Sequence, residues 1–461
     1  MEVAGIVAIC NLVTETNSNI ITHYLAHSMQ MLQHRGKAYW KMVIGNGIIG
    51  REGSLPPDDD ILKMVQEKKL YASNGIGYLS KRSPQFPSMN TIYAALDGFF
   101  VDTEKLHLHP YIGQARHSDS LFKIYYIFTY LLIQRQNAEL AAEFLDRHLR
   151  GNLIIKVNGD IYAYRNSSGF KPLVIATNRD KTLYIIASEN SLRTSFIDMD
   201  FNDIPAGQLT KLSIKKGFEI LTNLTSGRLM MDPFEFIRES HVAAVINGKS
   251  VYSIRKNIGK EQANLLAKEV DTGSAYAEPD YTRPMALGFS IEYQRFHKDF
   301  EISEGIIKDR YDDSDHMIDF SEQVSKNKLL TTGRSLKFVI KNLVSNKKVA
   351  TIQGTIQTGS TARETIYYLR NAGAQCVDVI VSYVATVDGR QVGLYTHNRD
   401  LIANKYVGEV SSINELNNKI TKEIGADSIN YNSPEILARG IGLSEKNLWF
   451  PEWVRFLDYR K

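Results

Sequence analysis

Small and hydroxyl-bearing residues stand between two apolar segments in the sequence KVATIQGTIQTGSTARETIYYLRNAGAQCVDVIVSY, residues 348–383. The apolar residues at 349–352 and 377–383 are typical of buried strands. Between them, apolar residues recur at helical spacing from 362 to 372. This order predicts a right-handed strand–helix–strand crossover, with Ser360 or Thr361 capping the start of the helix and Gly373 ending it.

The loop before this helix has residue types that can bind an anion. Gly359, Ser360 and Thr361 would lie where the free N–H groups and the positive end of the helix dipole converge. Their hydroxyl groups, with that of Thr355, would add hydrogen-bond donors. We therefore predict a phosphate site formed by Thr355, Gly359, Ser360 and Thr361, as part of a nucleotide or phosphate-binding protein. An ordinary turn in a doubly wound sheet, without a ligand, is the alternative.

The loop resembles that of the type I phosphoribosyltransferases, and specifically of the glutamine-dependent amidophosphoribosyltransferases of purine synthesis. Their loop reads Val-Asp-Asp-Ser-Ile-Val-Arg-Gly-Thr-Thr-Ser-Arg, and its phosphate-binding half is kept here. In that family the paired aspartates hold the ribose hydroxyls of phosphoribosyl pyrophosphate and support its magnesium. Gln353 and Gly354 stand at those two positions. The resemblance thus makes magnesium possible, but we predict no cofactor and no metal site because the acidic pair is replaced.

The N-terminal sequence resembles the glutaminase domain of the same family. AGIVAI at 4–9 and LQHRG at 32–36 match the opening of this N-terminal-nucleophile hydrolase domain, whose nucleophile is a processed N-terminal cysteine. Ala4 occupies the place of that cysteine, and a methyl group cannot form a thioester. We therefore predict no catalytic residue in this half. Cys10 lies further along the same expected strand and is interpreted as a core residue.

Other residues of the implied glutamine site are partly kept. The resemblance predicts a vestigial glutamine site at Arg35, Asp97, Gly98 and Asp119. Asp97 replaces the asparagine of the family's oxyanion hole, and an ionised carboxylate there would repel an oxyanion. Ser80 replaces an arginine that pairs with the glutamine carboxylate, although Lys81 or Arg82 can partly substitute after a shift in register.

Two further segments stand for substrate-binding loops of the transferase half. EPDYTRPMALGF at 278–289 replaces a Pro-Asp-Ser-Gly pyrophosphate loop, and IIKDRY at 306–311 stands for a flexible Lys-Asn-Arg-Tyr loop. The possible transferase-loop residues are Asp280, Lys308, Arg310 and Tyr311. Acidic residues follow where the family has a basic stretch, at Asp312, Asp313 and Asp315. These carboxylates form either a solvated loop or a relocated cation site.

The motif spacing implies two domains. Residues 1–231 are expected to form an α+β, N-terminal-nucleophile hydrolase αββα sandwich, and residues 232–461 an α/β type I phosphoribosyltransferase domain. The apolar segment 121–133 is too short to span a bilayer and is interpreted as a buried helix. His23, His27 and His34 are interpreted as helix-surface residues. The aromatic residues at 449–453 are expected to pack in the core of this chain, on the glutaminase domain or on a neighbouring subunit.

Composition excludes several classes of protein. The 461 residues include 55 basic and 51 acidic residues, and this balance does not favour nucleic acid binding. Two cysteines exclude a disulfide framework. The start MEVAGIVAIC lacks the basic residues of a signal peptide, so we expect a cytoplasmic protein that does not enter a membrane.

Two functions remain open at this point, and with them whether the protein is an enzyme. The first is a divergent, non-catalytic paralogue of amidophosphoribosyltransferase, a pseudoenzyme with a nucleotide-binding or regulatory role. The second is an ammonia-dependent phosphoribosyltransferase that makes 5-phosphoribosylamine. Because the family assembles as homo-oligomers, the resemblance implies a homo-oligomer or a hetero-oligomer with an active paralogue.

Overall fold

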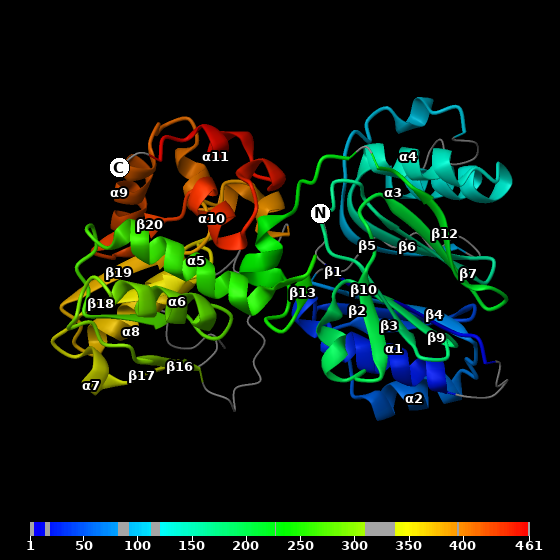
Figure 1. Ribbon diagram of the computed structural model, residues 1–461, viewed down its shortest axis with the longest axis horizontal. Coiled ribbons are helices and arrows are strands. Elements are labelled where there is room, and N and C mark those ends of the chain that lie inside the picture. The colour runs from blue at the N-terminus through cyan, green and yellow to red at the C-terminus, as the bar shows by residue number, and fades with distance from the viewer. Residues whose placement is uncertain are drawn as a thin grey trace. The chain divides into compact units, whose positions relative to one another are not determined.

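The chain forms two compact units in the computed structural model, which describes residues 4–13, 19–81, 92–111, 120–225, 227–308, 337–393 and 396–459 (Figure 1). The first unit contains Met1–Asp232 and Glu239–Gly248. The second contains Pro233–Arg238 and Lys249–Lys461. The chain therefore passes between the units three times between residues 232 and 249.

Two antiparallel sheets make up the centre of the first unit. The larger has the order β10-β8-β9-β1-β4-β2-β3, from β1 (Ala4–Asn11), β2 (Tyr39–Ile44), β3 (Gly47–Glu52), β4 (Asn74–Ser80), β8 (Val174–Asn178), β9 (Leu183–Ala187) and β10 (Met199–Asp203). The smaller has the order β12-β11-β7-β6-β5, from β5 (Ile92–Phe100), β6 (Leu149–Val157), β7 (Asp160–Arg165), β11 (Gln208–Ser213) and β12 (Gly217–Asn223).

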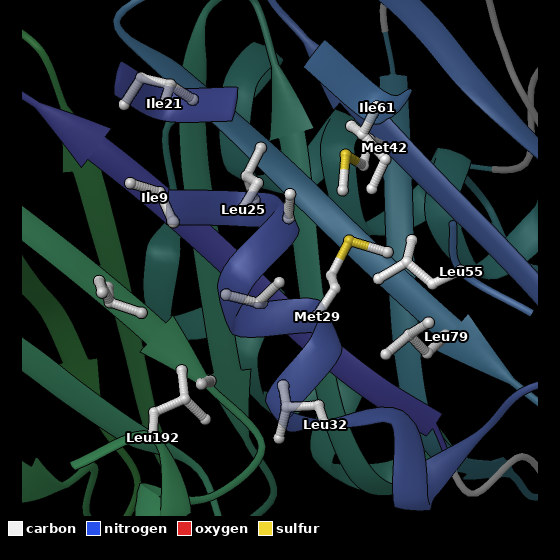
Figure 2. Close-up of a cluster of buried hydrophobic side chains, with 14 of the residues drawn as sticks. Ile9, Ile21, Leu25, Met29, Leu32, Met42, Leu55, Ile61, Leu79 and Leu192 are labelled. Atoms are coloured by element: carbon white, nitrogen blue, oxygen red, sulfur yellow. The ribbon is translucent and has the colours of Figure 1, made fainter. Parts of the chain in front are cut away.

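Two pairs of helices cover the outer faces of these sheets. α1 (Ile20–Met31) and α2 (Asp58–Glu67) share a buried apolar cluster with the larger sheet, and Figure 2 shows Leu25 of α1 near Ile9 of β1 and Met29 of α1 near Leu55 and Leu79. α3 (Ser120–Thr129), its π-helical continuation η4 (Tyr130–Gln134) and α4 (Ala138–His148) share another with the smaller sheet. A third cluster lies between the sheets. The expected αββα sandwich and the buried helix at 121–133 are confirmed.

β1 shows how the sequence pattern fills these layers. Val7 and Ile9 belong to the cluster beneath the helices, whereas Ile6, Ala8 and Cys10 belong to the cluster between the sheets. This alternation follows from the two-residue period of a strand. Cys10 is fully buried, and burial raises the pKa of its thiol to about 12. The interpretation of Cys10 as a core residue is confirmed.

A parallel four-stranded sheet organises the second unit. Its order is β15-β18-β19-β20, from β15 (Ser274–Ala277), β18 (Lys348–Gln353), β19 (Cys376–Val381) and β20 (Ser428–Tyr431). β16 (Ile306–Lys308) and β17 (Lys337–Val339) form a separate antiparallel ribbon. The helices are α5 (Val251–Leu266), α6 (Arg283–Tyr293), α7 (Lys341–Val344), α8 (Ser360–Asn371), α9 (Ile413–Ile424), α10 (Pro434–Ile441) and α11 (Glu452–Phe456).

The predicted crossover at 348–383 is confirmed as β18, α8 and the parallel strand β19. The prediction of its helix cap was wrong. Gly359 is the N-cap, with φ of 79°, and Ser360 is already the first helical residue. A turn in the left-handed region favours glycine over a hydroxyl-bearing residue. Gly373, with φ of 94°, follows the last helical turn as predicted.

The aromatic residues near the C-terminus lie in different environments. Phe450 is buried, and Trp449 and Trp453 are partly buried. The Arg390 guanidinium lies 5.8 Å from the centre of the Trp449 ring. Phe450 therefore belongs to the core of its own chain. Within the described residues, no helix combines the length and apolar character needed to cross a membrane.

Helices α5 and α6 pack closely together at a contact where each helix has a glycine. A Cβ atom at Gly259 of α5 would lie 1.9 Å from the carbonyl oxygen of Met285, and one at Gly288 of α6 would lie 1.9 Å from that of Lys256. Neither glycine needs a left-handed backbone. The two positions are glycine because backbone meets backbone at this crossing.

We expect Gly259→Ala to destabilise the protein although alanine is the better helix former. The added methyl group would force the two helices apart, at a cost of about 3 kcal/mol. Differential scanning calorimetry should show a melting temperature lower by roughly 8 °C. Lys260→Ala, on the exposed face of the same helix, is the matched control and should change stability by less than about 0.5 kcal/mol. A gain in stability from Gly259→Ala would contradict the close approach.

Candidate functional site

The first residue of β1 lies in a buried polar cluster of the first unit. Ala4 is fully buried, and its peptide N–H donates a hydrogen bond to Oδ1 of Asp97 at 3.2 Å. Ser188 accepts from the N–H of Ile6 at 2.9 Å and donates to the carbonyl oxygen of Ala4 at 3.3 Å. The end of β1 is thus held by side chains of β5 and of the turn after β9.

Arg35 lies at the centre of this cluster and is fully buried. Its guanidinium pairs with Oδ2 of Asp97 at 3.1 Å and with Oε2 of Glu189 at 3.3 Å. A third bond runs to the hydroxyl of Ser240, also at 3.3 Å. The planar array of guanidinium donors suits such simultaneous bonding. The arginine pairs with two buried carboxylates at once.

Both carboxylate oxygens of Glu189 have polar partners. His34 Nε2 lies 2.9 Å from its Oε1, Ser191 donates to the same oxygen at 2.6 Å, and the N–H of His241 lies 3.2 Å from Oε2. Burial opposes ionisation, but these neighbours and Arg35 outweigh it and hold the pKa of Glu189 well below its usual range. His34, interpreted as a helix-surface residue, has a partly exposed side chain. It lies in the short helix η1 (Gln33–Arg35), where its ring turns toward Glu189.

Glycines allow the strands around this cluster to meet. A Cβ atom at Gly36 would lie 2.5 Å from the Cα atom of Ser80, the residue paired with Ala4 across β1 and β4. Gly98 has φ of 143° and faces Gly151 across β5 and β6. A Cβ atom there would lie 2.2 Å from the Arg150 carbonyl oxygen. Neither position has room for a larger residue.

The structure brings together Arg35 and Asp97, two of the four residues predicted for a vestigial glutamine site, with Gly98 beside them. Asp119 lies outside the described residues, as does Arg82. Lys81, a suggested substitute for the missing arginine, is ion-paired with Glu239 at 3.4 Å. Sequence reasoning missed Glu239, Ser240 and His241 as members of this cluster, since their spacing carries no signal of a site. The cluster contains buried ion pairs, and position 4 offers no nucleophilic atom.

Replacing Arg35 with methionine should destabilise the first unit strongly. Asp97 and Glu189 would stay buried without their shared cation, and breaking such a pair costs about 3–5 kcal/mol. Urea-induced unfolding of the full chain would measure this loss. The triple variant Arg35→Met, Asp97→Asn, Glu189→Gln removes the charges together and should recover most of it. Lys63→Met breaks an exposed ion pair and should cost less than about 1 kcal/mol. Equal losses in the single and triple variants would contradict this account.

The loop between β18 and α8 forms the candidate phosphate site of the second unit. Gly359, Ser360 and Thr361 adjoin at the start of α8, and the first helical hydrogen bond runs from the Arg363 N–H to the Gly359 carbonyl. The N–H groups of the first turn come before that bond in the chain and therefore have no carbonyl partner within the helix. The Thr358 hydroxyl accepts from the Ser360 N–H at 3.3 Å. Thr361 is exposed.

Contacts from elsewhere in the second unit fix this loop. Arg363 donates from Nη1 to the Thr358 carbonyl at 3.2 Å, and the N–H of Ile402 donates to the Gln357 carbonyl at 2.8 Å. Thr355, the fourth predicted phosphate ligand, lies beside the Tyr281 hydroxyl instead. The Ser360 N–H and hydroxyl both bond to the Thr358 hydroxyl, and the Thr361 hydroxyl is exposed at the same helix start, where an N-terminal turn suits a phosphate.

A second buried polar network lies at the carboxyl end of β18. Lys337 Nζ lies 2.5 Å from Oε1 of Glu278 and 3.8 Å from Oε2 of Glu364. The Thr365 hydroxyl donates to Oε2 of Glu278 at 2.7 Å, and the Gln353 amide nitrogen donates to the same oxygen at 3.2 Å. Glu278 is therefore neutralised within the protein.

These residues do not fit a magnesium ion. Magnesium needs carboxylate or water oxygens around it, whereas Gln353 points its NH₂ group at Glu278 and an ammonium group already occupies the other oxygen. Among the described residues, no group of three or more His, Cys, Asp or Glu side chains is arranged to hold a metal ion. Asp312, Asp313 and Asp315 lie outside this part of the chain.

Of the possible transferase-loop residues, Lys308 adjoins this network through the β16–β17 ribbon, whereas Asp280 is exposed. The Asp280 carboxylate is exposed and lies 3.9 Å from the Arg283 guanidinium. Lys308 stands opposite Lys337 in the β16–β17 ribbon. Arg310 and Tyr311 lie outside the described residues. Of the predicted loop, the structure therefore describes Asp280 and Lys308.

The chain is similar to curated amidophosphoribosyltransferases. It is 30% identical over 310 residues to that of Methanocaldococcus jannaschii, covering 63% of this chain and 60% of the relative. It is 28% identical over 279 residues to that of Synechococcus elongatus (59% and 51%), and 24% identical over 433 residues to that of Schizosaccharomyces pombe (82% and 76%). The chain is therefore related in sequence to the amidophosphoribosyltransferases. No family model matches it.

Solved structures of this family share the fold. The glutamine phosphoribosylpyrophosphate amidotransferase of B. subtilis, complexed with ADP and GMP, has a TM-score of 0.69 at 22% identity, over 95% of this chain and 92% of that one. A structure described as the allosteric regulatory enzyme of purine biosynthesis has a TM-score of 0.73 at 21% identity, covering 96% and 94%. The predicted N-terminal-nucleophile and type I phosphoribosyltransferase folds are thus confirmed. The matches to the first curated relatives span about 51–60% of those proteins' length.

Proposed function

We propose that this chain is a member of the amidophosphoribosyltransferase family that does not hydrolyse glutamine and that binds the phosphate group of a nucleotide, with a regulatory role in purine synthesis. The observation that carries the proposal is the environment of Ala4. Its side chain is a methyl group, and its backbone nitrogen is a peptide N–H bonded to Asp97. Neither a thiol nor a free amine is present at that position.

The charges around Ala4 also oppose acyl chemistry. Hydrolysis of an amide passes through an oxyanion, which needs hydrogen-bond donors in a preorganised site. Asp97 presents acceptors, and its two oxygens already bond to the Ala4 N–H and to Arg35. Glu189 accepts from Arg35, Ser191 and the His241 N–H. A substrate carboxylate would compete with two buried carboxylates for one arginine.

The second unit supports the phosphate-binding half of the proposal. The first turn of α8 offers N–H groups, and the exposed hydroxyl of Thr361 lies beside them. A phosphate monoester needs no more than these donors and the helix dipole. The B. subtilis relative was solved with ADP and GMP, which favours a nucleotide as the ligand class.

An ammonia-dependent phosphoribosyltransferase is the second candidate, because free ammonia would bypass the glutaminase half. The loop between β18 and α8, which contacts within the second unit hold in place, favours this second candidate. The network at Glu278 opposes it, since the carboxylate that lies beside β18 is already neutralised by Lys337. Formation of phosphoribosylamine from ammonia and phosphoribosyl pyrophosphate would therefore support this candidate over the regulatory one.

Purified protein should release no ammonia from glutamine. Ala4→Cys should not restore the reaction, because Asp97 and Ser80 would still stand where donors are needed and the new thiol would lack a free α-amino group. A coupled glutamate dehydrogenase assay, with a mock purification as control, would measure ammonia. Glutamine-dependent release above the mock preparation would contradict the proposal.

The phosphate site should prefer AMP or inorganic phosphate over the magnesium complex of phosphoribosyl pyrophosphate. Gly359→Asp should abolish binding, because it adds a carboxylate and strains a residue with φ of 79°. Thr361→Glu is a milder test, since glutamate is tolerated in the first turn of a helix but repels phosphate. We expect it to weaken binding at least about tenfold in calorimetric titration.

A control for these two variants is available on the far end of the same helix. Arg370→Glu is exposed and should leave phosphate affinity unchanged. Tighter, magnesium-dependent binding of phosphoribosyl pyrophosphate than of AMP would refute the stated preference.

A further inference from the structure

Tyr281 fills space directly against the backbone of Gly354. A Cβ atom at Gly354 would lie 2.2 Å from Cε2, 2.7 Å from Cζ and 2.6 Å from the hydroxyl oxygen of the tyrosine. Gly354 does not adopt a left-handed backbone, so its conformation alone would allow other residues. A side chain at position 354 would meet the tyrosine ring, so one of the two groups would have to shift.

The loop that carries Tyr281 is tied to the sheet. The N–H of Glu278 donates to the Ile352 carbonyl of β18 at 3.0 Å, and the Thr282 hydroxyl donates to the Glu278 carbonyl at 2.5 Å. Tyr281 therefore leaves a short, anchored turn between β15 and α6. Its backbone has little freedom to carry the ring away from Gly354.

Other side chains hold the ring itself. The Arg238 guanidinium lies 5.4 Å from the ring centre, within the range of a cation–π contact. Burial raises the pKa of the Tyr281 phenol, and Arg238 and Thr355 offset part of that increase. The Tyr281 hydroxyl therefore lies near Thr355, in the loop that leads to the phosphate site. The Tyr281 ring therefore extends from Gly354, which follows β18, to Thr355 in that loop.

Tyr281 and Gly354 are both departures from the motifs this chain resembles. Position 354 has an acidic residue in the resembled loop, and position 281 follows the kept Pro279 and Asp280, where that motif has serine. The structure places these two departures in contact, although they are far apart in the sequence. They act as one change, since an aspartate at 354 and a tyrosine at 281 cannot occupy the same space.

We propose that Tyr281 is a specificity-determining residue that fills the part of the site next to β18 and restricts its ligands to those held by their phosphate group alone. A ligand with a sugar and a diphosphate beyond that phosphate would need the space that the ring occupies. The phosphate turn at Gly359–Thr361 is left open. This inference rests on the proposed function for its ligand, while the packing of Tyr281 on Gly354 can be tested without any ligand.

A double-mutant cycle tests the packing. Gly354→Ala should lower the melting temperature by roughly 6 °C in the wild-type background and by less than about 2 °C in the Tyr281→Ser background. Gly273→Ala is the matched control, because a Cβ atom there meets only the Lys348 carbonyl oxygen, at 3.5 Å. It should have little effect in either background. An equal loss from Gly354→Ala in both backgrounds would overturn the packing claim.

Calorimetric titration tests the specificity. Inorganic phosphate, AMP and phosphoribosyl pyrophosphate with magnesium would each be titrated into wild type, Tyr281→Ser and Tyr281→Phe. In Tyr281→Ser, affinity for phosphoribosyl pyrophosphate relative to inorganic phosphate should rise at least about tenfold. Tyr281→Phe keeps the ring and should match the wild type. An unchanged ratio in Tyr281→Ser, with phosphate binding intact, would overturn the role of the ring.

The proposed phosphate function and the inference about Tyr281 would be contradicted by different results. If none of these compounds binds wild type or Tyr281→Ser, the proposed phosphate function and the selectivity of Tyr281 both fail, and the melting cycle still decides the packing. If phosphate binds but the cycle shows no coupling, the proposed function stands and the inference about Tyr281 fails.

Discussion

The fully buried Arg35 guanidinium is the interaction on which the first unit depends. It joins η1 to β5 through Asp97, to the turn after β9 through Glu189, and to the segment 239–248 through Ser240. Charges removed from water are tolerated only when paired and hydrogen-bonded. The polar groups around Ala4 are therefore bonded to one another within the first unit.

In the second unit, a buried lysine pairs with a buried carboxylate, as Arg35 does in the first unit. Lys337 neutralises Glu278 at the carboxyl end of the parallel sheet, and Thr365 and Gln353 satisfy the other carboxylate oxygen. Ligands of parallel α/β sheets bind at that end of the strands. A site whose charges are balanced internally has no need of a metal ion. What stays open to an anion is the first turn of α8, where the donors belong to the backbone.

Departures from the resembled motifs occur in spatially matched pairs. Ala4 and Asp97 meet through a hydrogen bond, and Gly354 and Tyr281 meet through direct packing. In the first pair Asp97 accepts from the Ala4 N–H, and in the second the Tyr281 ring lies where a side chain at position 354 would be.

Local patterns in the amino-acid sequence predict the local architecture and the frame of both sites. The two-residue period of β1 and the crossover at 348–383 follow from backbone geometry and side-chain periodicity, which act over a few residues. Only the tertiary structure decided the partners. Arg35 and Glu189 are 154 positions apart, and Glu278 and Gln353 are 75 apart. The positions of His34, Thr355 and Tyr281 were likewise set by such contacts. No local pattern encodes which distant side chains meet, because burial and charge pairing are satisfied only once the whole chain has folded.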